Sequence, residues 1–168
     1  NLVETIGKGA FLECKKLASV TFSENSTLKT IGYGAFSQCS SLASTSENPL
    51  IIPDSVTSIG EYAFYGCSSL VSLIIPESVE TIGNYAFTEC SSLASLTIGN
   101  SVETIGDHAF YYCTSLTSLT IGNSVMSIGY KAFYGCTSLA SLIIPDSVTT
   151  IGYGAFRLCS SLGSMTIG

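Results

Sequence analysis

The chain has 168 residues, of which 46% are hydrophobic and 11% are charged, and its formal net charge is −6. This apolar content excludes a disordered chain and suffices for one domain with a substantial core. The scattered basic residues argue against a nucleic-acid partner, and the absence of an apolar run near the roughly 20 residues of a membrane-spanning helix argues against membrane insertion by this segment.

One pattern recurs seven times along the chain. Each copy contains Ile-Gly-x-x-Ala-Phe-x-x-Cys followed by Leu three residues later, and the copies begin at Ile6, Ile31, Ile59, Ile82, Ile105, Ile128 and Ile151. From the third copy onward the spacing is 23 residues, whereas the first two units are lengthened within residues 23–30 and 43–49. Such a repeat predicts a solenoid, because each unit can bury its apolar face only against its neighbours. We expect residues 1–168 to form a single repeat domain that is a segment of a longer array.

Within each unit the chain order predicts a strand, a turn and a short helical turn. In residues 115–122 apolar and polar residues alternate with the period of a half-buried strand, and Gly122 ends it. The next two residues, Asn-Ser, predict a turn. Ile128, Ala132 and Cys136 then follow at four-residue spacing, which predicts a one-sided stripe on a short helix or 3₁₀ turn.

Stacking these units gives the expected fold, an α/β solenoid. Its seven coils of about 23 residues would place a parallel β-sheet on one face and short helical turns on the other. The recurring Leu, Ile, Val, Phe, Ala and Cys residues would form buried columns. The glycine after each Ile fits either a positive φ or a close approach between coils.

His108 is the chain's single histidine, and we expect it to have no catalytic or metal-binding role. It occupies a position that we predict to face solvent, because the other units carry there Gly9, Gly34, Tyr62, Tyr85, Lys131 and Gly154. A zinc site would need three or four converging ligands.

The seven cysteines are 23 to 28 residues apart, a spacing that matches no metal motif, and we interpret them as reduced, buried packing residues. The chain contains no phosphate-binding loop and no nucleophile paired with a base. We therefore expect a protein that is not an enzyme and that has no catalytic residue, metal or cofactor.

Two surfaces are candidates for binding. The first is the outward face of the predicted sheet, with Ser95, Thr97, Ser118, Thr120, Ser141 and Ile143. It could equally be a solvated ladder of small residues. The second is rich in tyrosine, a residue common at interfaces, with Tyr62, Tyr65, Tyr85, Tyr111, Tyr112 and Tyr134. The alternative is that these rings lie over the gaps between coils and shield the edge of the core.

The strand pattern followed by Ile-Gly-x-x-Ala-Phe-x-x-Cys resembles the BspA-type leucine-rich repeat over essentially the whole chain. The resemblance implies a surface or secreted protein that adheres to a protein ligand, such as a host or extracellular-matrix protein or another cell-surface protein. The chain opens on "NLVETIG", without a signal-peptide pattern. Three alternatives stay open. The first is a structural protein that assembles end to end, and the second is a Ser/Thr ladder that binds a repetitive surface such as polysaccharide or ice. The third is a consensus-built or engineered array, which the near-identity of units three to six suggests and the irregular first two units argue against. We expect the insertion at 43–49 to provide local specificity.

Overall fold

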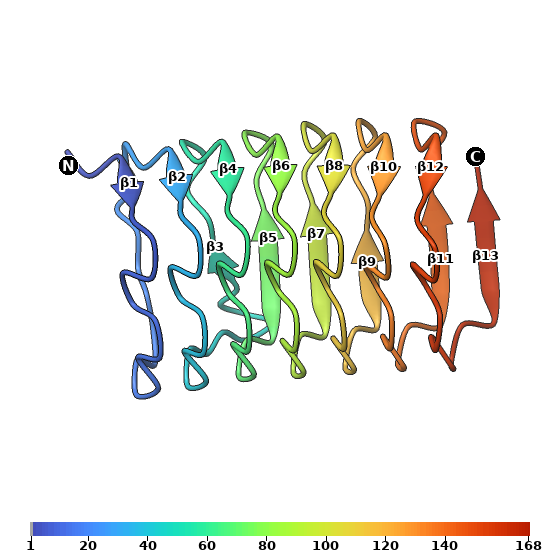
Figure 1. The fold of residues 1–168 in the computed structure, drawn as a ribbon, viewed down its shortest axis with the longest axis horizontal. Helices are drawn as coiled ribbons and strands as arrows, with labels where there is room; N and C mark the ends of the chain where they lie inside the picture. Colours follow the sequence, from blue (N-terminus) through green and yellow to red (C-terminus); the bar gives the residue numbers. More distant parts are fainter. Residues whose placement is uncertain (1) are drawn as a thin grey trace.

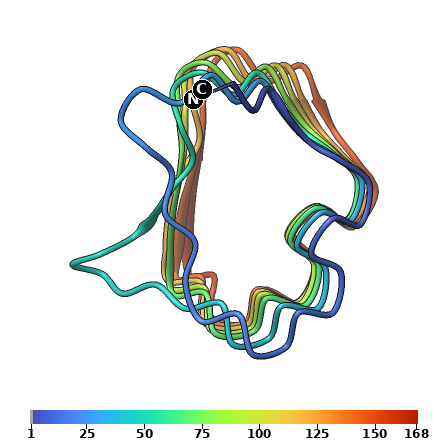
Figure 2. The ribbon, with the colours of Figure 1, turned by 90° about the vertical axis from the view of Figure 1, so that its left-hand side faces the viewer.

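The computed structural model describes residues 2–168, which form a parallel β-solenoid of seven stacked coils (Figure 1). Seen end on, the successive coils superpose as one closed outline (Figure 2). The predicted solenoid with a unit of about 23 residues is therefore confirmed.

The largest sheet contains one two-residue strand from every coil. All seven strands are parallel, in the order β1-β2-β4-β6-β8-β10-β12. Their bounds are β1 (Thr5–Ile6), β2 (Thr30–Ile31), β4 (Ser58–Ile59), β6 (Thr81–Ile82), β8 (Thr104–Ile105), β10 (Ser127–Ile128) and β12 (Thr150–Ile151). The register places each Ile beside the Ile of the next coil, as Ile105 lies beside Ile128. This sheet was not predicted, because its isoleucines had been assigned to a helical stripe.

The predicted strands form two further parallel sheets. One has the order β3-β5-β7-β9 and the other pairs β11 with β13. Their bounds are β3 (Leu50–Ile51), β5 (Ser72–Ile75), β7 (Ser95–Ile98), β9 (Ser118–Thr120), β11 (Ser141–Ile144) and β13 (Ser164–Ile167). The parallel ladder is thus present but interrupted between β9 and β11.

The predicted short helical turns are wrong, since residues 2–168 contain no helix. In each unit two residues four positions apart have left-handed backbone, for example His108 with φ 55° and Tyr112 with φ 56°. An α-helix requires negative φ throughout. Some backbone amides of this segment donate hydrogen bonds to the next coil and others donate within their own turn. Phe110 N donates to Ala132 O of the next coil at 2.8 Å, whereas Cys113 N donates to Phe110 O at 3.3 Å. The segment is therefore a stack of tight turns.

The core consists of columns, as predicted. The seven phenylalanines of the repeat motif, from Phe11 to Phe156 and without Phe22, stack face to face, with centroids of neighbouring rings 5.1 to 5.3 Å apart. Six cysteines are buried beside them, and each thiol donates to the carbonyl oxygen of a Phe in the preceding coil, as Cys113 Sγ does to Phe87 O at 3.4 Å. Cys14, in the first coil, is exposed, so the expectation of burial is wrong for this residue.

The two lengthened units form loops that project on the side of the long strands, in blue and teal in Figure 2. Ser44, in the second of them, keeps the neighbouring coil in register. Its Oγ accepts hydrogen bonds from the amides of Val71 at 3.0 Å and Ser72 at 2.9 Å, and donates to Ser72 O at 2.9 Å. In regular coils a backbone carbonyl does this, as Val71 O does for Ser95 N. A side-chain hydroxyl thus replaces the carbonyl that the insertion removes from the ladder.

Candidate binding surfaces

The sheet face consists of the six predicted residues on β7, β9 and β11. Ser118, Thr97, Thr120, Ser141 and Ile143 are exposed, the last at 70% of its surface, and Ser95 is half-buried. Parallel pairing aligns Ser95 with Ser118 and Thr97 with Thr120. Ser141 and Ile143 lie across the interruption and are not paired with β9.

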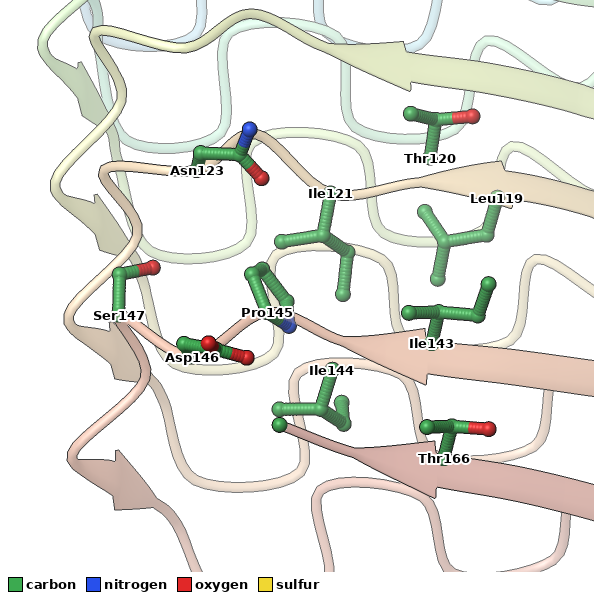
Figure 3. Close-up of a pocket in the computed structure, with 11 residues that line it drawn as sticks. Leu119, Thr120, Ile121, Asn123, Ile143, Ile144, Pro145, Asp146, Ser147 and Thr166 are labelled. Atoms are coloured by element: carbon green, nitrogen blue, oxygen red, sulfur yellow. The ribbon is translucent and has the colours of Figure 1, made fainter.

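A hollow of about 530 Å³ lies at this interruption (Figure 3). Thr120 of β9, Ile143 of β11 and Thr166 of β13 line it, together with Pro145. Proline has no N–H to donate to a ladder, whereas Gly99 at the same position of an earlier coil donates to Ile75 O at 3.0 Å. Pro145 accounts for the loss of that one bond.

The tyrosines gather on the stacked turns. All nine tyrosines and His108 form one connected set of ring contacts, which we call the aromatic surface: Tyr33, Tyr62, Tyr65, Tyr85, His108, Tyr111, Tyr112, Tyr130, Tyr134 and Tyr153. At its centre Tyr62 stacks on Tyr85 at 4.8 Å, and Tyr85 stacks on His108 at 4.6 Å, with nearly parallel planes. The coil repeat causes this arrangement, because neighbouring coils in a ladder lie about 4.8 Å apart.

The six predicted tyrosines all lie on this surface. Tyr112 is 38% exposed and the other five are half-buried. Each ring therefore covers part of its neighbour and also presents surface to solvent. Lys131 adds a positive charge, with its Nζ 4.9 Å from the ring centroid of Tyr130 and 5.4 Å from that of Tyr134.

His108 faces solvent only in part, whereas we predicted a solvent-facing position. It is half-buried, stacked on Tyr85, and its Nδ1 is buried without a hydrogen-bond partner. Burial lowers the pKa of His108, the positive charge of Lys131 lowers it further, and Asp107 opposes both effects. The recurrence of Tyr62, Tyr85 and His108 at one position of three consecutive units could have revealed this stack in the sequence.

The described residues hold no group of three or more His, Cys, Asp or Glu positioned to bind a metal ion. Burial raises the pKa of the Cys90 thiol to about 12 and that of Cys113 well above its ordinary value. At neutral pH these thiols are protonated and can donate to backbone carbonyls. Within residues 2–168 no helix is long and apolar enough to cross a membrane.

Comparison with known proteins identifies relatives of this chain. The family described as "BspA type Leucine rich repeat region" matches residues 1–48 and 43–163, in six copies. No curated protein matches the chain.

Three solved structures illustrate the similarity. A leucine-rich repeat protein from Bacteroides ovatus has 34% sequence identity and a TM-score of 0.87, and the match covers 98% of this chain and 41% of that protein. A leucine-rich repeat protein of T. pallidum has 31% sequence identity and a TM-score of 0.67, and the match covers 88% of this chain and 61% of that protein. The pneumococcal vaccine antigen PcpA has 27% sequence identity and a TM-score of 0.58, and the match covers 98% of this chain and 48% of that protein. The chain thus spans less than two thirds of each of these relatives.

Proposed function

The chain belongs to the BspA type leucine-rich repeat family, and from this premise we propose that it is a non-enzymatic scaffold that binds a protein ligand, at the cell surface or after secretion. The ligand would be a host or extracellular-matrix protein, or a protein on another cell. Its mode of action would be adhesion through many weak contacts spread over several coils, without a deep pocket.

The aromatic surface is the observation that carries this proposal. Tyrosine provides a large contact area with few rotatable bonds, and here the ring contacts with neighbouring coils fix the rings further. A partner therefore has little side-chain entropy to overcome when it docks on Tyr111, Tyr112 and Tyr134. Lys131 gives the same surface a site for an acidic group.

The test measures binding to an array of purified extracellular-matrix and cell-surface proteins by surface plasmon resonance. Changing Tyr111, Tyr112 and Tyr134 to Ser should lower the affinity for a captured protein at least about tenfold, as loss of interface anchors does. The milder Tyr112→Ser should give a smaller loss, and circular dichroism establishes that both variants fold. The matched control changes the sheet face instead, with Thr97, Thr120 and Ile143 replaced by Lys, and should stay within about twofold of the parent.

Other outcomes would count against the proposal. Loss of binding only in the sheet-face variant would move the site to β7, β9 and β11. If no protein of the array binds the unaltered chain, the adhesion function fails. A molecular mass that rises with concentration in light scattering would favour the alternative of an end-to-end assembly protein.

The alternative function, binding of a repetitive surface by a Ser/Thr ladder, is less well supported than protein binding, because of the residues on the sheet face. Its outward column contains Ile51, Ile74, Thr97, Thr120, Ile143 and Thr166. Isoleucine occupies half of these positions, so no regular array of hydroxyls is presented to polysaccharide or ice.

A further inference from the structure

The two lengthened units enclose a hollow of about 810 Å³ that lies apart from the aromatic surface. Its wall includes Phe22 and Glu24 from the first unit, and Asn48, Ile51 and Asp54 from the second. The volume is within the usual range of ligand sites, about 300 to 1,000 Å³. The hollow exists because both insertions project on this side of the solenoid (Figure 2).

One edge of a sheet opens into this hollow. β3 is the first strand of its sheet and pairs on one side only, where Ile51 lies beside Ile74 of β5. In the preceding coil residues 17–29 form no strand, so its other side has no strand partner among the described residues. An open strand edge accepts an extended peptide through backbone hydrogen bonds.

The charge of the hollow is negative. Glu24 and Asp54 are exposed on its wall, and no Lys, Arg or His lines it. Within residues 2–168 the one ion pair joins Lys15 to Glu13, so neither carboxylate is neutralised by a cation of the chain. A basic side chain between them would form charge-assisted hydrogen bonds.

Ser55 supplies an independent observation. It lines the hollow, and its Oγ is buried without a hydrogen-bond partner. At the same position of the next unit, Ser78 Oγ donates to Val56 O of the preceding coil at 2.7 Å. The preceding coil is in register here, since Thr57 N donates to Lys29 O as Glu80 N donates to Thr57 O, yet Ser55 Oγ finds no acceptor. A buried hydroxyl without a partner is costly unless a ligand satisfies it.

We propose that this hollow binds an extended peptide segment bearing a lysine or arginine side chain, with its backbone added to the open edge of β3 and its cation between Glu24 and Asp54. The proposal rests on the proposed function and deepens it, because it assigns a second contact and the chemistry of the segment that makes it.

Fluorescence anisotropy with a labelled (Lys-Thr)₄ peptide tests the proposal on the whole chain. The double change Glu24→Gln and Asp54→Asn should weaken binding at least about tenfold. Glu80→Gln with Glu103→Gln removes the same charge from exposed positions outside the hollow and should stay within about twofold. Ser55→Ala should weaken binding about fivefold and raise, not lower, the thermal stability of the free protein, since it removes a buried hydroxyl that has no partner.

Several results would overturn the assignment. An equal loss of affinity in both double variants would show that the peptide responds to the net charge of the protein and not to the hollow. Equal affinity for a labelled (Glu-Thr)₄ peptide would remove the role of the carboxylates. Saturable binding of a soluble glucan oligosaccharide, without binding of the peptide, would show that the hollow is a carbohydrate site and not a peptide site.

A failure here is distinguishable from a failure of the proposed function. The variant that changes Tyr111, Tyr112 and Tyr134 to Ser should bind (Lys-Thr)₄ as the unaltered chain does. Absence of peptide binding in all variants would reject the hollow as a site and leave protein capture on the aromatic surface to be judged by its own experiment.

Discussion

His108 occupies a position where tyrosine stands in the two preceding coils, and its environment suits an uncharged ring better than a cation. The ring stacks on Tyr85 and meets the edges of Tyr111 and Tyr130. Its Nδ1 is buried without a partner, and burial together with Lys131 lowers its pKa below the ordinary 6.5. The backbone there has φ 55°, close to the 57° of Tyr85, so this backbone conformation already carries a tyrosine in another coil.

We therefore predict that His108→Tyr stabilises the protein by about 1 kcal/mol at pH 7.5, because the stack continues and a buried nitrogen without a partner disappears. It should also remove a pH dependence. The folded-state pKa of His108 lies below its unfolded-state value, so the unfolded chain binds more protons between the two. The stability of the parent therefore falls as the pH drops from about 6.5 toward the folded-state pKa, and that of the variant should not.

Urea unfolding of both proteins at pH 7.5 and pH 5.5 measures these effects. The informative quantity is the difference between the two pH values, since the carboxylates are common to both chains and cancel to first order. The same acid-induced loss of stability in the variant would assign the effect to groups other than His108.

At the scale of the repeating element, the glycine column controls how closely the coils stack. The glycines after the recurring Ile do not have positive φ, so the structure selects close approach, the second of the two predicted explanations. A Cβ on Gly106 would lie 2.7 Å from the backbone of Gly83 and Asn84 in the preceding coil. Backbone cannot yield as a flexible side chain can, so the coils would have to separate there.

Gly106→Ala should lower the free energy of unfolding by about 1 to 3 kcal/mol, the range typical of overpacking. Gly7→Ala is the matched control, because Gly7 also lacks a positive φ and a Cβ on it would meet nothing within 4 Å. Chemical denaturation of the two variants gives the comparison. Equal effects would mean that the glycines serve the conformation of their own turn and not the spacing of the coils.

How far the sequence predicted each element depends on which physical feature defines it. The phenylalanine and cysteine columns could be predicted because a position that keeps the same apolar residue in every unit indicates burial. The position of Phe110 carries phenylalanine in all seven units, and Phe110 is buried. The turns were mistaken for helices because residues such as Glu89, at φ 60°, adopt a left-handed conformation that their residue type does not predict. The hollow beside Ser55 could not be predicted, because it depends on how two irregular loops fold past each other.

At the scale of the whole molecule, stability is distributed along one axis. Each coil contacts its two neighbours, so coils in the middle are covered on both sides and terminal coils on one. Cys90 and Cys113 have no exposed surface, whereas Cys159, in the last coil, is 9% exposed and Cys14 in the first coil is exposed. The end coils should therefore open more often than the middle.

The thiol column offers a direct measurement of this gradient, because it places a reactive group in every coil. We predict that Cys14 reacts with iodoacetamide at once at pH 8, and that Cys90 and Cys113 react at least about a hundredfold more slowly than Cys159, since labelling requires both local opening and a thiolate. Mass spectrometry of digested, pulse-labelled protein gives the seven rates. Denatured protein, in which all seven should react alike, is the control. Identical slow rates from Cys39 to Cys159 would show that the solenoid opens only as a whole, and rapid labelling of Cys113 would contradict the buried column itself.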